Sequence, residues 1–228
     1  MNNLISLKKI SKSFANNKRI SVLKKINYSF VKGKIYSLMG PSGSGKSTLL
    51  NILSMIDKPT TGSLLIDNNE IKFSETIKND KIRSKKIGII YQQNNLLPDF
   101  TALENVYLAS LALSNDKSSS IEKSKRVIKK MGLSSRQNHY PTELSGGEMQ
   151  RIAIARAIIN EPEIILADEP TGSLDQATAK DVFKVLYKLK NKNRLIIYAT
   201  HNRFFANMAD CKLEMIGGNI KTSNGRIK

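Results

Sequence analysis

The stretch GPSGSGKS, from Gly40 to Ser47, constrains this chain more than any other part of its sequence. Its pattern is Gly-x-x-x-x-Gly-Lys-Ser, in which glycines permit backbone angles and close approaches that a Cβ atom would forbid. Successive backbone N–H groups can then point inward as a nest around phosphate oxygens. The pattern therefore predicts a phosphate-binding loop.

The flanking sequence supports this prediction, because a loop of this kind joins a strand to a helix. KIYSLM before the loop is typical of a strand, and KSTLLNILSMI after it has helical periodicity. The helix expected from about Lys46 adds the positive end of its dipole. Lys46 is expected to reach the β- and γ-phosphates of a nucleotide, and the Ser47 hydroxyl to ligate Mg²⁺. A flexible Gly/Ser-rich turn is the alternative, and the strand–loop–helix context disfavours it.

Composition limits the class of protein. With 228 residues the chain is one α/β domain, or a domain with a subdomain inserted in it. No apolar run approaches the ~18–20 residues that a bilayer crossing needs. The single cysteine, Cys211, excludes an internal disulfide and fits a reducing compartment. We therefore expect a cytoplasmic chain with no membrane anchor of its own.

The formal net charge of +18 is large, but its lysines are spread along the chain. Three explanations stay open: a biased composition, attraction to an anionic membrane surface, and nucleic-acid binding. Because the lysines form no single basic arm, we expect no specific nucleic-acid partner.

The periodicity of the sequence divides the chain into regions. Short strand-like segments fill the first third, and helical periodicity follows from about Thr101 to Met131. The second helix of that region is expected to start at one of Ser118–Ser120 and to stop at Gly132. Strand–helix alternation at both ends predicts a parallel sheet covered by helices. The expected fold is α/β of the P-loop type, with an antiparallel β subdomain on the N-terminal side and a helical subdomain inserted at about Asn94–Arg156.

A second chemical signal lies in IILADE, where an apolar strand ends in Asp168 and Glu169. Ligands bind at the carboxyl edge of a parallel sheet, which is where these carboxylates would lie. One carboxylate can hold Mg²⁺, while the next orients and deprotonates a water for in-line attack on the γ-phosphate. An exposed acidic turn is the alternative, and the apolar strand that leads into the pair favours function.

The sequence LSGGEMQR, Leu144–Arg151, places two glycines at the start of a helix, a second anion-binding helix end. GPSGSGKST, LSGGEMQR, ILADEPTGSLD and THN follow one another in this order. With this combination the chain resembles the ATP-binding subunits of ABC transporters over nearly its whole length. The resemblance implies the ABC-ATPase form of the P-loop fold, ATP and Mg²⁺ as ligands, and hydrolysis of ATP to ADP and phosphate.

The resemblance also implies roles for individual residues. Those that match the phosphate loop are Gly40, Pro41, Ser42, Gly43, Ser44, Gly45, Lys46, Ser47 and Thr48. Asp168 matches the magnesium carboxylate, Glu169 the catalytic base, and His201 the switch histidine that contacts the γ-phosphate. Gln92 matches the glutamine that senses magnesium and links to the membrane partner, with Gln93 beside it as the alternative.

Three more residues have an expected role. Phe14, in SKSFANN, resembles the aromatic residue that stacks on adenine, for which only a ring face is needed. An ordinary buried phenylalanine is the alternative. Asp175, in SLD, matches the D-loop of the family. His139, just before LSGG, is expected to order its loop rather than to take part in chemistry.

The resemblance implies a homodimer, because in this family the signature of one subunit completes the phosphate loop of the other. Ser145, Gly146 and Gly147 would then act in trans, near the γ-phosphate held by Lys46 of the partner subunit. A separate transmembrane permease subunit is also implied. The chain would lie at the cytoplasmic face of the inner (plasma) membrane as a peripheral protein.

Within the transporters, YQQNNLLPDFTALENV and KLEMIGGNIK are similar to the lipoprotein-releasing and macrolide-export branch. Cell-division ATPases share the motif set, so an interaction module that ATP only switches is the alternative. Met149 and the run Gln93–Asn95 depart from the pattern of the branch. They lie beside the surface expected to receive the membrane partner, so the identity of that partner stays open.

Overall fold

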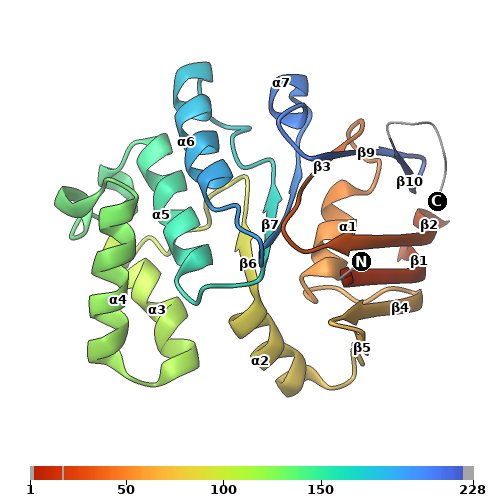
Figure 1. Cartoon of the computed structure of the whole chain (residues 1–228), viewed down its shortest axis with the longest axis horizontal. Helices are drawn as coiled ribbons and strands as arrows, with labels where there is room; N and C mark the ends of the chain where they lie inside the picture. Colours follow the sequence, from red (N-terminus) through yellow and green to blue (C-terminus); the bar gives the residue numbers. More distant parts are fainter. Residues whose placement is uncertain (1–2, 17, 223–228) are drawn as a thin grey trace. The chain divides into compact units, whose positions relative to one another are not determined.

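A computed structural model describes residues 3–16 and 18–222 of the chain (Figure 1). It contains two compact units. The first comprises residues 1–80, 166–168 and 190–228, and the second residues 81–165 and 169–189.

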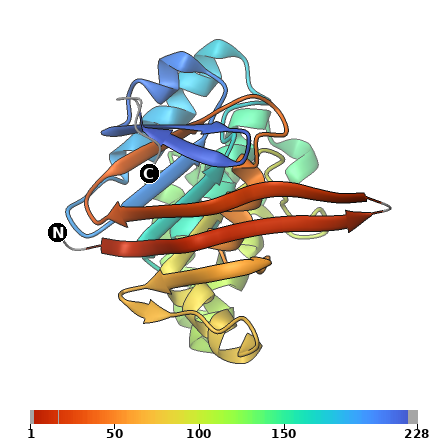
Figure 2. The same cartoon turned by 90° about the vertical axis from the view of Figure 1, so that its right-hand side faces the viewer.

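An antiparallel sheet forms the N-terminal part of the first unit. Its strand order is β2-β1-β4-β5, and its strands are β1 (Asn3–Asn16), β2 (Lys18–Val31), β4 (Thr61–Ile66) and β5 (Asn69–Glu70). Figure 2 shows β1 and β2 running side by side as the two longest strands. The antiparallel β subdomain predicted from the sequence is confirmed.

The strands of the second sheet that belong to the first unit lie in the order β10-β9-β3-β8-β7. Its strands are β3 (Ile35–Met39), β7 (Ile164–Asp168, of which the last three residues belong here), β8 (Leu195–Ala199), β9 (Cys211–Ile216) and β10 (Asn219–Thr222). β3 pairs in parallel with both β8 and β9. β8 is buried along its whole length, as a continuous apolar run in a parallel sheet should be. Helix α1 (Lys46–Leu53), the start of α2 (Thr76–Lys86) and the short helix α7 (Arg203–Ala206) belong to this unit.

The second unit is mainly helical. Its elements are the end of α2 (Thr76–Lys86), β6 (Ile87–Ile90), α3 (Ala102–Ser114), α4 (Lys117–Lys130), α5 (Gly146–Ile158), α6 (Gln176–Lys188) and the 3₁₀ turns η1 (Ser134–Arg136) and η2 (Pro141–Glu143). Helix α3 packs on α4 and α5, and α5 also packs on α6 and β6. Asn105 of α3 holds the preceding loop by hydrogen bonds. Its side-chain N–H groups donate to the carbonyls of Leu97 and Phe100, and its Oδ1 accepts from the Leu97 N–H.

One helix start differs from the sequence prediction. The start of α4 was predicted at Ser118–Ser120, and this is wrong: Asp116 is the N-cap, and its carboxylate accepts a 3.0 Å hydrogen bond from the Ser119 N–H. Ser120 instead lies buried, with its hydroxyl 3.0 Å from that of Ser114. The predicted stop at Gly132 agrees with the structure, because Gly132 follows the helix in the left-handed conformation, at φ 75°, that commonly ends a helix.

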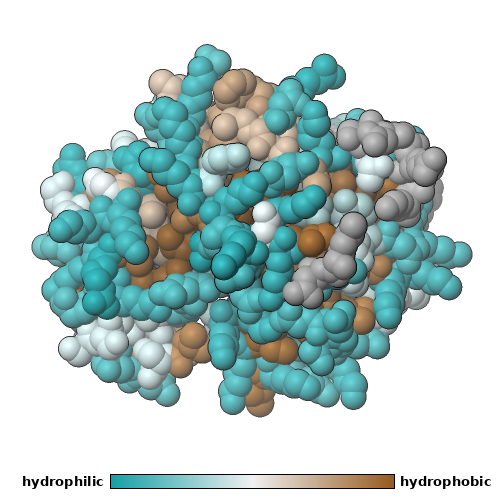
Figure 3. All heavy atoms as spheres, viewed as in Figure 1, coloured by the Kyte–Doolittle hydropathy of each residue, from teal (hydrophilic) through white to brown (hydrophobic). Residues whose placement is uncertain are grey.

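Hydrophilic side chains predominate on the face shown in Figure 3, with hydrophobic ones in separate patches between them. Within residues 3–16 and 18–222, no helix combines the length and the apolar character that a membrane crossing requires.

Candidate functional site

The loop between β3 and α1 has the backbone that its glycines predict. Gly40 has φ 147°, Gly43 has φ 76° and Gly45 has φ 102°. A Cβ atom on Gly40 would lie 2.4 Å from the carbonyl oxygen of Met215, and one on Gly45 would lie 2.8 Å from Cδ2 of Leu23. Both positions therefore need glycine for space as well as for conformation.

Two polar side chains of this loop are buried, those of Lys46 and Ser44. The Lys46 ammonium is nearly buried and donates to the carbonyls of Gly40 at 2.8 Å and Pro41 at 3.1 Å. The buried Ser44 hydroxyl has no hydrogen-bond partner among the described residues. A buried hydroxyl without a partner is costly, so this one fits a loop built around an oxygen-rich ligand.

Adjacent strand ends of the first unit carry the other predicted residues. β3 leads into the phosphate loop, and Leu38 at its end is in register with Ala199 of β8. The Thr200 N–H donates to the Leu38 carbonyl at 3.1 Å, so His201 directly follows this pairing. The next strand in the sheet, β7, ends at Asp168. The phosphate loop, His201 and Asp168 thus follow three neighbouring strands.

Phe14 lies in β1 and is 43% exposed, which argues against the alternative of a core phenylalanine. It is in register with Ile20 of β2. One face of its ring is covered: the Lys12 ammonium lies 4.8 Å from the ring centroid. The sequence reasoning passed over Lys12, although its position two residues before Phe14 puts both side chains on one side of the strand.

In the second unit, the side chains of Gln92 and Glu169 both lie close to Gly172. A Cβ atom at Gly172 would be 3.1 Å from Nε2 of Gln92 and 3.4 Å from Cβ of Glu169. The backbone of Glu169 is left-handed, with φ 45°, and its carbonyl accepts a 2.9 Å hydrogen bond from the Gly172 N–H. Such a conformation is uncommon for a residue with a long side chain and is typical of strained functional positions. Of the two candidate glutamines, this geometry favours Gln92 over Gln93.

The segment that follows Gln92 is held by Arg156 of α5. Its guanidinium donates to the Asn95 carbonyl at 2.6 Å and to the Asn94 carbonyl at 2.7 Å. Burial lowers the pKa of this guanidinium, which remains charged because an arginine pKa starts so high. Sequence reasoning gave Arg156 no role, since the partners lie 61 and 62 residues away.

The LSGG glycines and their serine form the start of α5. Ser145 is the N-cap and forms a capping box with Glu148: the Ser145 N–H donates to Glu148 Oε2 at 2.8 Å, and Ser145 Oγ accepts from the Glu148 N–H at 3.3 Å. The hydrogen bond from the Ser145 backbone is the main cause that lowers the pKa of Glu148, and the ion pair with Arg136 at 3.0 Å adds to it. Nη1 of Arg136 lies 3.2 Å from Nε2 of His139. This contact suits a histidine that orders the loop.

The D-loop lies against the start of α5 within the second unit. A Cβ atom at Gly146 would be 3.2 Å from Cδ2 of Leu174, and one at Gly147 would be 2.4 Å from Cγ2 of Thr178. Asp175 caps α6 and accepts from the N–H groups of Ala177 at 3.0 Å and Thr178 at 3.1 Å. Hydrogen bonds from Thr178 are the main reason that the pKa of Asp175 is lowered.

The predicted magnesium ligands suit Mg²⁺ in their chemistry. The Ser47 hydroxyl and the Asp168 carboxylate are hard oxygen donors, and Mg²⁺ is usually held by one or two carboxylates, waters and substrate phosphates. In the part of the chain that the structure describes, no three or more His, Cys, Asp or Glu residues group to hold a metal. One hydroxyl and one carboxylate, completed by waters and phosphate oxygens, would suit an ion that arrives with a nucleotide.

Comparison with known proteins gives likenesses that cover nearly the whole chain. Residues 23–172 match the family model described as ABC transporter. The "Lipoprotein-releasing system ATP-binding protein LolD" of Rickettsia bellii is 43% identical over 97% of this chain and 99% of its own length. The protein of the same name from Bacteroides thetaiotaomicron is 39% identical over 96% of this chain and 99% of its own.

Solved structures give the same picture. The ATP-binding cassette MJ0796, as a dimer in a post-hydrolysis state bound to ADP and Pi, superposes with a TM-score of 0.87. It is 36% identical, and the match covers 97% of this chain and all of that one. The cassette cbiO1 from Clostridium perfringens, part of the transporter complex cbiONQ, superposes with a TM-score of 0.84 at 25% identity.

Proposed function

The chain belongs to the ABC transporter family, and from this premise we propose that it is the ATP-binding, ATP-hydrolysing subunit of a transporter that releases lipoproteins. The observation that carries the nucleotide part is the phosphate loop. Gly40 and Gly45 have a positive φ at positions where a Cβ would clash, and the loop contains the nearly buried Lys46 and a Ser44 hydroxyl with no hydrogen-bond partner among the described residues. The lipoprotein part rests on relatives with that printed function, whose matches cover 97% and 96% of this chain.

We assign the hydrolytic step to residues that match the motifs of the family. Lys46 and the loop N–H groups bind the β- and γ-phosphates, and His201 contacts the γ-phosphate. Glu169 accepts a proton from the attacking water. The water oxygen bonds to the γ-phosphorus, and the bond between the γ-phosphorus and the oxygen that leaves with ADP breaks. Bound Mg²⁺, held by Ser47 and Asp168 with Gln92 as its sensor, would neutralise charge on the phosphates.

The working form in this proposal is a homodimer with two composite sites, consistent with the dimeric state named for similar cassettes. Ser145, Gly146 and Gly147 of one subunit would face the γ-phosphate bound by Lys46 of the partner subunit, with the positive end of α5 directed toward it. Asp175 would lie at the subunit boundary. Phe14 would stack on the adenine ring.

A separate membrane subunit completes the proposal. Among the described residues no helix can cross a bilayer, so the chain would act at the cytoplasmic face of the inner membrane through a transmembrane permease subunit. The Gln92–Asn95 segment would transmit the nucleotide state to that subunit.

Steady-state phosphate release from the purified chain tests the enzymatic part. Lys46→Ala should lose most ATP binding, whereas Lys188→Ala, which removes the same charge from an exposed position on α6, should behave like the natural chain. Undiminished ATP affinity in Lys46→Ala would refute the phosphate-loop assignment. Steady turnover would also exclude a module that ATP only switches.

Co-purification tests the cellular part. A tagged Glu169→Gln chain, solubilised gently from native membranes with ATP present, should bring a permease subunit and bound lipoprotein with it. Recovery with a division protein instead would favour the cell-division alternative, and recovery as a soluble dimer alone would count against a membrane partner.

A further inference from the structure

Lys12 is a nearly buried lysine inside the antiparallel sheet of the first unit, 8% exposed on β1. Neighbouring lysines on the same strand, Lys8 and Lys9, are exposed. A buried ammonium needs partners for its donors, because the loss of water is otherwise costly. The partners of Lys12 therefore indicate what holds it in place.

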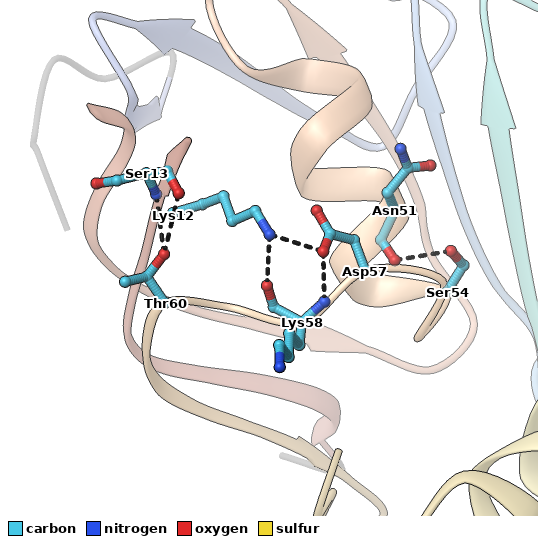
Figure 4. Close-up of polar contacts among 7 residues, drawn as sticks. All are labelled: Lys12, Ser13, Asn51, Ser54, Asp57, Lys58 and Thr60. Carbon is cyan, nitrogen blue, oxygen red and sulfur yellow. Dashed lines mark hydrogen bonds and ion pairs between the residues drawn. The ribbon is translucent and has the colours of Figure 1, made fainter. Parts of the chain in front are cut away.

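Two oxygens of the segment Asp57–Lys58 accept hydrogen bonds from the Lys12 ammonium (Figure 4). Nζ lies 2.7 Å from Oδ1 of Asp57 and 2.9 Å from the carbonyl oxygen of Lys58. The same Asp57 oxygen accepts from the Lys58 N–H at 2.7 Å. Two of the three ammonium donors are thus used, and their direction is fixed.

The segment that holds Lys12 is itself attached to the helix of the phosphate loop. The N–H groups of Ile56 and Asp57 donate to the carbonyl of Asn51 in α1, at 3.0 and 3.1 Å. Lys12 therefore connects β1 with the end of the helix that begins at Lys46. Although Lys12 and Asp57 are 45 residues apart in sequence, they form one contact.

The same ammonium lies 4.8 Å from the centroid of the Phe14 ring, within the range of an attractive cation–π contact. Phe14 is 43% exposed, so few side chains restrict its ring. Without this contact, the ring could occupy more than one staggered rotamer. A cation fixed on one side favours the orientation in which one ring face is covered and the other is available.

We propose that Lys12 is a positioning residue for adenine recognition: its ammonium, fixed by Asp57 and the Lys58 carbonyl, orients the Phe14 ring and covers one face so that the base stacks on the other. This inference rests on the proposed function, because it takes Phe14 as the stacking ring. If the ring is already oriented before the base binds, less conformational entropy is lost on binding. The contribution of Lys12 should therefore depend on the base and not on the phosphates.

The test compares two ligands that differ by the nucleoside. Dissociation constants for Mg-ATP and for Mg-tripolyphosphate are measured by calorimetry on the full chain. Lys12→Met keeps an unbranched side chain of similar length and removes the ammonium. We expect ATP binding to weaken roughly three- to tenfold with tripolyphosphate binding unchanged, and Lys12→Arg to restore most of the ATP affinity.

Two further variants test whether Lys12 acts through the Phe14 ring. Lys8→Met removes the same charge from an exposed position on the same strand and should change neither affinity. Phe14→Leu should weaken ATP binding alone, and adding Lys12→Met to it should cause no further loss. That result would show that Lys12 acts through the ring.

The outcomes separate this inference from the function on which it rests. Equal weakening of ATP and tripolyphosphate by Lys12→Met would overturn the inference, because the lysine would then act on folding or on phosphate charge. If Phe14→Leu weakens ATP binding and Lys12→Met does not, the inference alone fails. If Phe14→Leu leaves ATP affinity intact, the adenine-stacking role of Phe14 fails, and the role of Lys12 fails with it.

Discussion

Gly147 and Thr178 lie so close that a single carbon atom would not fit between them: a Cβ at 147 would stand 2.4 Å from Thr178 Cγ2. Gly147 is in the first turn of α5, and Thr178 is in the first turn of α6. The signature glycine is therefore required by packing within one chain, apart from any contact with a nucleotide across a dimer.

Gly147→Ala should destabilise the chain by about 1–3 kcal/mol, because the new methyl group forces Thr178 or α5 to shift. Thr178→Ser removes the Cγ2 atom and keeps the hydroxyl group. The double variant should recover most of the lost stability in urea unfolding. Recovery of stability without recovery of ATPase activity would separate the packing role of Gly147 from its proposed role in trans. A double variant as unstable as Gly147→Ala would contradict the close packing.

Glu169→Gln should lower turnover by roughly 10²- to 10⁴-fold, the range expected when a general base is removed. ATP binding should persist, so the variant should accumulate as an ATP-bound dimer in size-exclusion chromatography. Glu161→Gln is a matched control, since Glu161 also has a left-handed backbone, at φ 53°. A Glu169→Gln chain that keeps most of its rate would remove Glu169 from the role of base.

Arg156→Lys should loosen the segment after Gln92, because a lysine cannot donate to the carbonyls of Asn94 and Asn95 in the same two-pronged geometry. We expect a loss of about 1–3 kcal/mol in stability, faster amide hydrogen exchange at residues 92–96, and a lower ATPase rate. Arg126→Lys, at an exposed position on α4, is the control. Unchanged exchange in that segment would show that Arg156 does not hold it.

The capping box of α5 should depend on pH. The pKa of Glu148 is lowered in the folded chain, so its charge stabilises the fold above about pH 4.5 and this contribution is lost as the pH falls below that value toward the folded pKa. Glu148→Gln should therefore be less stable than the natural chain by about 0.5–1 kcal/mol at neutral pH. The two stabilities should converge in unfolding measurements at acid pH. A difference that stays constant down to pH 3 would exclude this carboxylate as the cause.

The phosphate loop could be predicted from the sequence because its residues are consecutive and its glycine requirement is local. The same holds for the order of the motifs, which predicted the fold. Helix α2 was not predicted: its sequence TIKNDKIRSKK has almost no apolar face, and Asn79 is its one buried residue. Periodicity arguments depend on such a face.

Contacts between distant residues could not be predicted. Nothing near Lys12 in the sequence indicates Asp57, and nothing near Arg156 indicates Asn94. The start of α4 was mistaken for a different reason. Three consecutive serines and Asp116 are all acceptable caps, and the choice depended on Ser120 being buried against Ser114. The site roles of Gln92, His201 and Phe14 stay predictions from the sequence.

Directed evolution for heat resistance would oppose the proposed catalytic role of one residue, Glu169. Glu169 has φ 45°, a conformation that glycine and asparagine adopt more easily than glutamate. A screen that rewards thermal survival alone should therefore enrich these two residues at position 169 and remove the carboxylate. A library built on this chain would need either a selection that also requires ATP hydrolysis or a glutamate codon held fixed at position 169.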